Sequence, residues 1–314
     1  MSTRWKTGAI AALGFTLPLL AAAQAANAGP DAIESVEAAA AGLGVNVPLV
    51  GRLTGAGGIL FLSTVDVTNN AAQDAQVDFY LDGVDVATSA SISRVGSISS
   101  AGTLVAQGAG GAMRHRSNAH FDDFVGALVS AGLLDSSVQT DGFIGSVLFV
   151  FNGFTKRGQG AATVRFYNEF GGGTIGQALR GHEISTGEPQ TLIATFRDSR
   201  SAANGPKLYA NLFINNTGLT PAGATAAGSI TVRLQAIADS TGAAVGTPVD
   251  LTIGAGQTAS VSDVLHRLGA PGGEDTILVT ATVTSGSAAI AGAAVQVDNT
   301  TKDGSVVDMS RGDF

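Results

Sequence analysis

Apolar and polar residues alternate with a period of two along most of the chain, and this pattern constrains the fold more than any other feature. Val65 and Val67 alternate with polar residues, as do Phe79 and Leu81 in the next run. Successive side chains of a strand point to opposite faces of a sheet, so the alternation predicts strands with one buried face. Residues 143–151 are almost continuously apolar, which predicts a strand buried on both faces.

Short blocks of sequence occur twice in the same order. The matched pairs are residues 64–69 with 211–216, 77–79 with 232–234, 121–125 with 261–265, 143–151 with 277–283, and 164–168 with 295–299. Each half also carries a short helical insertion, and hydrophilic residues 183–190 form the predicted linker between the halves. We therefore predict an all-β fold of two tandem β-sandwich domains, at residues 47–182 and 191–314.

The N-terminus has the pattern of a secretory signal peptide. Arg4 and Lys6 precede an apolar run, and Ala26-Asn27-Ala28 provides the small residues of a cleavage site. We predict a signal peptide at residues 1–28, a leader with a short helix at 29–46, and export to the periplasm, the cell surface or the medium. The chain has no other apolar stretch long enough for a transmembrane helix, so we predict none in the mature protein.

Several structural segments resemble a known group of proteins. They are residues 47–50 and 55–58, the Val-x-Val-Thr-Asn block at 65–69, and Tyr167-Asn168 followed by residues 173–177. Together they are similar to exported bacterial proteins with tandem immunoglobulin-like β-sandwich repeats, a group without an assigned activity. The resemblance covers most of the mature chain and implies the immunoglobulin-like fold and export. Its motifs are turns and strands, so it implies no catalytic residues.

Motifs for catalysis and cofactor binding are weak. The chain has no cysteine, which excludes thiol nucleophiles, disulfides and zinc–thiolate sites. Residues 171–176 satisfy the GxGxxG pattern, but Gly181 leaves barely one turn for the helix that a dinucleotide site needs. No GxSxG motif is present. We therefore predict no catalytic residue, no cofactor, no metal ion and a protein that is not an enzyme.

One cluster is the candidate for ligand binding. It consists of Arg114, His115, Arg116 and His120. Imidazole and a neighbouring carboxylate are ordinary metal ligands, but the adjacent arginines repel a cation, which favours a polar loop. Asp122, which follows the cluster, is interpreted as a helix cap, and Asp263 as the equivalent cap in the second half.

Charge and aromatic content narrow the choice of partner. The formal net charge of −8 argues against nucleic acid, because phosphate binding needs clustered cations. The only tryptophan, Trp5, lies in the predicted signal peptide, and three tyrosines give little surface for stacking on sugars. We predict a non-enzymatic secreted structural or adhesive protein with a protein or cell-surface partner. The alternative is a small-ligand or carbohydrate-binding module, and self-association through strand edges is a further possibility.

Overall fold

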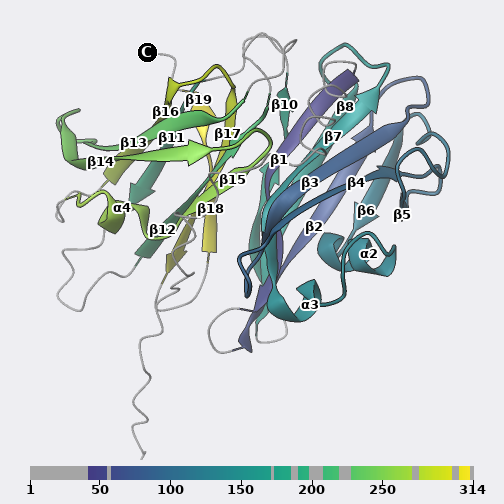
Figure 1. Ribbon diagram of the computed structural model, residues 1–314, viewed down its shortest axis with the longest axis horizontal. Coiled ribbons are helices and arrows are strands. Elements are labelled where there is room, and N and C mark those ends of the chain that lie inside the picture. Colours follow the sequence, from purple (N-terminus) through teal and green to yellow (C-terminus); the bar gives the residue numbers. More distant parts are fainter. Residues whose placement is uncertain are drawn as a thin grey trace, which may run out of the picture.

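The chain forms two β-rich units that lie side by side (Figure 1). This computed structural model describes residues 42–54, 58–170, 173–184, 190–197, 208–218, 228–270, 276–298 and 304–311. Within these ranges almost all regular structure is antiparallel sheet, as the alternating pattern predicts.

The elements follow one another in an order that is similar in both units. The first unit contains β1 (Gly42–Thr54), β2 (Leu60–Asn69), β3 (Val77–Asp85), β4 (Ser91–Ile98), β5 (Leu104–Val105), β6 (Ser117–Phe121), α2 (Phe124–Ser130), α3 (Val138–Asp141), β7 (Phe143–Asn152), β8 (Gly160–Phe170), β9 (Gly173–Arg180) and β10 (His182–Ile184). The second contains β11 (Thr191–Arg197), β12 (Leu208–Asn216), β13 (Ile230–Ala238), β14 (Ala244–Ile253), β15 (Thr258–Val261), α4 (Val264–Arg267), β16 (Thr276–Ser285), β17 (Ile290–Asp298), β18 (Gly304–Asp308) and β19 (Ser310–Arg311).

Strand β1 belongs to both layers of the first unit. It pairs with β7 and β10 over most of its length, and its last two residues, Leu53 and Thr54, pair with β2. A register shift between Val47 and Val50 accommodates Pro48, which has no backbone N–H to donate to the ladder. One layer thus has the order β5-β4-β3-β7-β1-β10 and the other the order β6-β2-β8-β9.

A core of phenylalanine and branched aliphatic side chains fills the space between these layers. Phe124 of α2 packs edge-on against Phe79, Phe121 and Phe149, with ring centroids 5.7 to 6.2 Å apart. These four side chains come from both layers and from the helix, so the helix covers one end of the core. The helix buries Phe124, Val125 and Leu128, and Phe121 is the last residue of strand β6 before it.

The second unit has the same strand order as the first. Its layers are β14-β13-β16-β11-β19 and β15-β12-β17-β18, so every described strand of the second unit has a counterpart in the first, whereas β5 of the first unit has none among the described strands of the second. Strand pairing identifies equivalent residues. Val65 lies opposite Phe121 in the first unit and Leu212 lies opposite Val261 in the second, so Leu212 corresponds to Val65 and Val261 to Phe121. Four of the matched blocks therefore fall on equivalent elements of the two units.

The fifth matched block is wrong by one residue. Val65 pairs with Val164 in the first unit, and its counterpart Leu212 pairs with Ala294 in the second, so Val164 corresponds to Ala294 and not to Val295. A shift of one residue turns a side chain to the other face of a sheet. Ala294 accordingly lies in the core of the second unit, while Val295 joins the apolar cluster of the first.

The two units are joined mainly through one face of each, and β9 of the first unit also lies beside β18 of the second. The outward face of the β1–β7–β3 layer packs, through β1 and β7, against the outward face of β12 and β17. The side chains of the second unit that enter the apolar cluster of the first are Phe213, Ala293 and Val295. Asn46 Nδ2 donates to Asn215 Oδ1 at 3.0 Å, and Asn215 Nδ2 donates to Ser146 Oγ at 3.0 Å. This interface explains why β7 is buried on both faces, as predicted for residues 143–151.

The faces that meet in this interface are not equivalent ones. The counterpart of the β1–β7–β3 face in the second unit is the outward face of β11–β16–β13, whose side chains are partly exposed. They include Thr191, Ile193, Leu278, Thr280 and Thr282. The counterpart of the β12–β17 face is the outward face of β2 and β8, where Asp66 stands in the place of Phe213 and Arg165 in the place of Val295.

The predicted boundaries need correction at two places. Residues 42–46, expected in the leader, form the first part of β1, because they complete the ladder with β7 and β10. Residues 183 and 184, expected in the linker, belong to β10. The signal peptide at 1–28, the rest of the leader and residues 185–189 lie outside the described residues. No helix in the described ranges is long and apolar enough to cross a membrane.

Candidate functional site

The four residues of the predicted cluster do not share one site. Arg114, His115 and Arg116 lie in the loop before β6, at the end of the first unit where β2 ends. His120 lies on β6 and faces outward, because it alternates with the buried Ala119 and Phe121. His120 is thus close to the other three residues in the sequence, but the direction of β6 carries it away from them in the structure.

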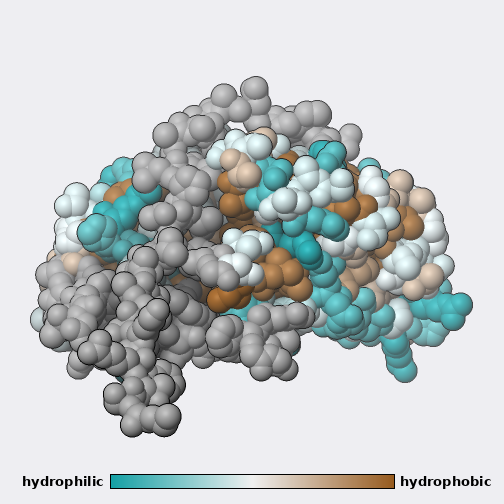
Figure 2. Space-filling model, turned by 90° about the horizontal axis from the view of Figure 1, so that it is seen from below, coloured by the Kyte–Doolittle hydropathy of each residue, from teal (hydrophilic) through white to brown (hydrophobic). Residues whose placement is uncertain are grey.

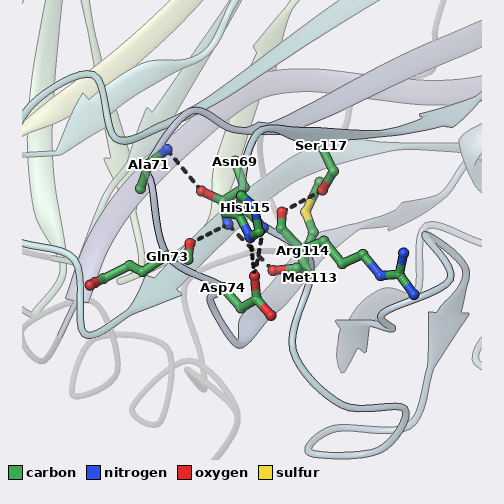
Figure 3. A network of polar contacts seen from close by, with 8 residues as sticks. All are labelled: Asn69, Ala71, Gln73, Asp74, Met113, Arg114, His115 and Ser117. Atoms are coloured by element: carbon green, nitrogen blue, oxygen red, sulfur yellow. Dashed lines mark hydrogen bonds and ion pairs between the residues drawn. The ribbon is translucent and has the colours of Figure 1, made fainter.

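His115 is held by Asp74 in a network that Figure 3 shows from close by. Its backbone N–H donates to Asp74 Oδ1 at 2.8 Å, and its ring Nδ1 lies 2.8 Å from the same oxygen. The backbone hydrogen bond and then the ring contact lower the pKa of Asp74 below its usual value. Arg114 is exposed and extends away from the network, and Arg116 adopts a left-handed backbone conformation with φ 51°.

The buried side chain of Asn69 holds the same loops in place through hydrogen bonds to their backbone. Its Oδ1 accepts from the backbone N–H of Ala71 at 3.0 Å, and its Nδ2 donates to the carbonyls of Gln73 and Met113 at 3.0 and 3.3 Å. The equivalent Asn216 does the same in the second unit, where it accepts from Gly218 and donates to two carbonyls.

His120 lies between two carboxylates on the outward face of β2 and β6. Its Nδ1 is 2.8 Å from Asp66 Oδ1, and its Nε2 is 3.0 Å from Asp122 Oδ1. A neutral imidazole has one N–H, so only the protonated ring donates to both oxygens. The hydrogen bond to Asp66, followed by that to Asp122, raises the pKa of His120 above its usual value of about 6.5.

This arrangement predicts that His120 stabilises the fold in a pH-dependent way. Because its pKa is raised in the folded state, its contribution is complete below the unfolded pKa and is lost as pH rises through the folded pKa. The wild-type chain should exceed His120→Gln in unfolding free energy at pH 5.5, and the difference should shrink by pH 8.5. In an NMR titration, Asp66→Asn should lower the pKa of His120. An unchanged titration in Asp66→Asn would contradict the assignment.

The helix caps differ from those predicted. The N-cap of α2 is Asp123, whose Oδ1 accepts from the backbone N–H of Gly126 at 3.0 Å and whose Oδ2 pairs with Arg52. Asp122 instead contacts His120, so its interpretation as a cap is wrong. Asp263 occupies the N-cap position of α4, but its side chain makes no capping hydrogen bond, because its backbone has the left-handed φ of 45°.

A second basic segment lies beside the first, and sequence analysis missed it. Asn69, at the end of β2, pairs with Ser117 on one side and with Gly160 on the other. The loop before Gly160 carries Lys156 and Arg157, both exposed. Only the pairing of β6 and β8 with the same strand reveals this proximity, because the two loops are about 40 residues apart in the sequence.

Other candidate motifs have structural roles. Residues 173–180, which follow the first glycines of the GxGxxG pattern, form strand β9 in a hairpin with β8, and no dinucleotide-binding helix is there. Tyr80 and Tyr167 are 4% and 8% exposed, so neither offers a free ring face to a sugar. Among the described residues, no group of three or more His, Asp and Glu side chains is placed to hold a metal ion.

Comparisons with known proteins add no assignment. Neither a family model, nor a curated protein, nor a solved structure matches the chain.

Proposed function

We propose that the chain is an exported, non-enzymatic protein with a structural or adhesive role, built from two immunoglobulin-like β-sandwiches that present their surfaces to a partner. The observation that carries this proposal is the interface between the units. Its buried hydrogen bonds, from Asn46 to Asn215 and from Asn215 to Ser146, fix one unit against the other, so the loops and edges are displayed in one arrangement. A fixed display of this kind lowers the entropy lost on binding a partner.

The polar side chains near the candidate cluster support a binding role over a catalytic one. His120 is engaged by two carboxylates, Asp123 caps a helix and pairs with Arg52, and His115 is tied to Asp74. A general base needs a nitrogen directed at a substrate proton, whereas both ring nitrogens of His120 already contact carboxylates.

Self-association through strand edges is a weaker part of the proposal. The long edge strand β14 is mostly exposed. It carries Pro248, which cannot donate to a new ladder, and Gly246 at φ 70°, where its register shifts. The N–H of Thr247 donates to the carbonyl of Leu268 at 2.7 Å. Bulges, proline and covered amides are devices that prevent edge pairing, so we place the partner surface elsewhere.

Fractionation of the producing cells tests this proposal. We expect the protein outside the cytoplasm, and we expect purified mature protein, added back, to be retained on the cells or their matrix. An unrelated exported protein of similar size and charge serves as the control for non-specific retention. Recovery in the cytoplasm, or as a free monomer that is not retained on cells or matrix, would contradict the proposal.

A further inference from the structure

We infer that the loops at one end of the first unit bind an anionic polysaccharide; this deepens, and rests on, the proposed function. The loops follow β2 and precede β6 and β8, at residues 70–76, 111–116 and 153–159. We call this surface the basic loop end, and its cations are Arg114, Arg116, Lys156 and Arg157.

Pairing and hydrogen bonds place these loops next to one another. Ser117 and Gly160 flank Asn69 on adjacent strands, which puts their Cα atoms about 10 Å apart at the usual strand spacing. The N–H of Asn70 donates to the carbonyl of Gln159 at 2.8 Å, and Ala75 exchanges two backbone hydrogen bonds with Met113. One extended anion can therefore contact all three loops.

The basic loop end has a charge opposite to that of the chain as a whole. Among the described residues of these loops and the strand ends beside them, four permanent cations lie near three carboxylates: Asp74, which contacts His115, Glu183, which accepts from the N–H of Gly158, and Asp78, which accepts from the side chains of Gln76 and Asn152. Within the described residues this is a local excess of one positive charge on a chain of net charge −8. All four cations are exposed, and within the described residues Arg114, Arg116 and Lys156 form no ion pair.

The loops are also ordered by internal hydrogen bonds. Gln159 Oε1 accepts from the backbone N–H groups of Thr155 and Lys156 at 3.2 and 2.9 Å. Asn69 holds the other two loops through Ala71, Gln73 and Met113. A ligand that binds here meets loops that are already arranged, so less binding energy is lost to ordering them.

The side chains at this end favour a polysaccharide over a membrane or a nucleic acid. Arginine presents a planar set of donors that matches the oxygens of carboxylate and sulfate groups. The two large apolar side chains in these loops, Met113 and Phe154, are 2% and 1% exposed. Membrane insertion needs an exposed apolar group, and single-stranded nucleic acid needs an exposed aromatic ring for stacking. A chain of anionic sugars needs only the cations.

Binding to defined polymers tests the inference. We expect the mature protein to bind immobilised polygalacturonate or heparin, with neutral dextran as the blank, and to dissociate in about 0.5 M NaCl, where screening acts over a few ångströms. Comparison of the two polymers distinguishes carboxylate from sulfate as the recognised group. Binding to neither polymer, or to anionic phospholipid vesicles alone, would overturn the inference.

Charge-reversal variants locate the site. Arg114→Glu with Arg116→Glu should weaken binding by about tenfold, and Lys156→Glu alone by about threefold, because each acts on the same ligand from a separate loop. The matched control is Arg197→Glu with Arg267→Glu, two exposed arginines of the second unit, which should bind as the wild type does. Circular dichroism checks that each variant is folded. Equal binding by the loop variants and the control pair would refute the site.

Retention on cells separates this inference from the proposed function. If cells retain the loop variants as well as the wild type, the partner binds elsewhere and the inference fails while the proposed function stands. If cells retain neither protein, the proposed function fails as well.

Discussion

Replacing Phe213 by aspartate should destabilise the protein by about 3–5 kcal/mol, because the ring lies in the interface between the units and a carboxylate there loses its hydration. Phe213 is 4% exposed and belongs to the apolar cluster of the first unit. Since each unit has a core of its own, the variant should also unfold in two steps where the wild type unfolds in one. Urea titration followed by far-UV circular dichroism measures both effects.

The matched control for this variant is Thr195→Asp, an exposed outward residue on a strand of the free face of the second unit. It introduces the same carboxylate on a sheet surface, and its unfolding free energy should stay within about 0.5 kcal/mol of the wild type. If the two variants lose equal stability, the contact between the units contributes nothing to the fold.

Asn69→Ala and Asn216→Ala should each lower the unfolding free energy by about 3 kcal/mol. Each asparagine is fully buried, and its removal deletes three buried hydrogen bonds, one from a backbone N–H and two to backbone carbonyls. The two losses should be similar, because the two side chains make the same kinds of contact at equivalent strand ends. Chemical denaturation of both variants provides the comparison.

The neighbouring Asn70→Ala is the control, since its side chain is exposed and the change leaves the backbone hydrogen bond to Gln159 in place. We expect an effect below about 0.5 kcal/mol. A loss at Asn70 as large as that at Asn69 would mean that the buried network is not the source of stability.

The period of two predicts most strands correctly, because each unit buries one face of each layer and the alternation records that face. The continuous apolar run at 143–151 correctly predicts burial on both faces, although the sequence does not show that the second cover is the other unit. The match of Val295 to Val164 fails because similar residue types occur on both faces of β17, and only the pairing partners determine the register.

The candidate site is harder to predict, because its residues come together through strand pairing. His115 and His120 are five residues apart in sequence but have separate partners, Asp74 for the first and Asp66 with Asp122 for the second. Conversely, Lys156 is distant in sequence yet lies in a loop adjoining that of Arg116, since both flank the end of β2. Spacing along the chain carries no information about such cross-strand neighbours.

Because the two units contact each other through unlike faces, the free faces at the two ends of the molecule are also unlike. Because each unit uses a different face in this contact, repeating the same contact would add units in an open series and not in a closed pair. On the β2–β8 face of the first unit the same contact would bury charged groups. Asp66 and Arg165 occupy there the positions at which Phe213 and Val295 form the contact between the two units. A few side chains thus decide whether this joint can form at a given face, although the strand arrangement is the same in both units.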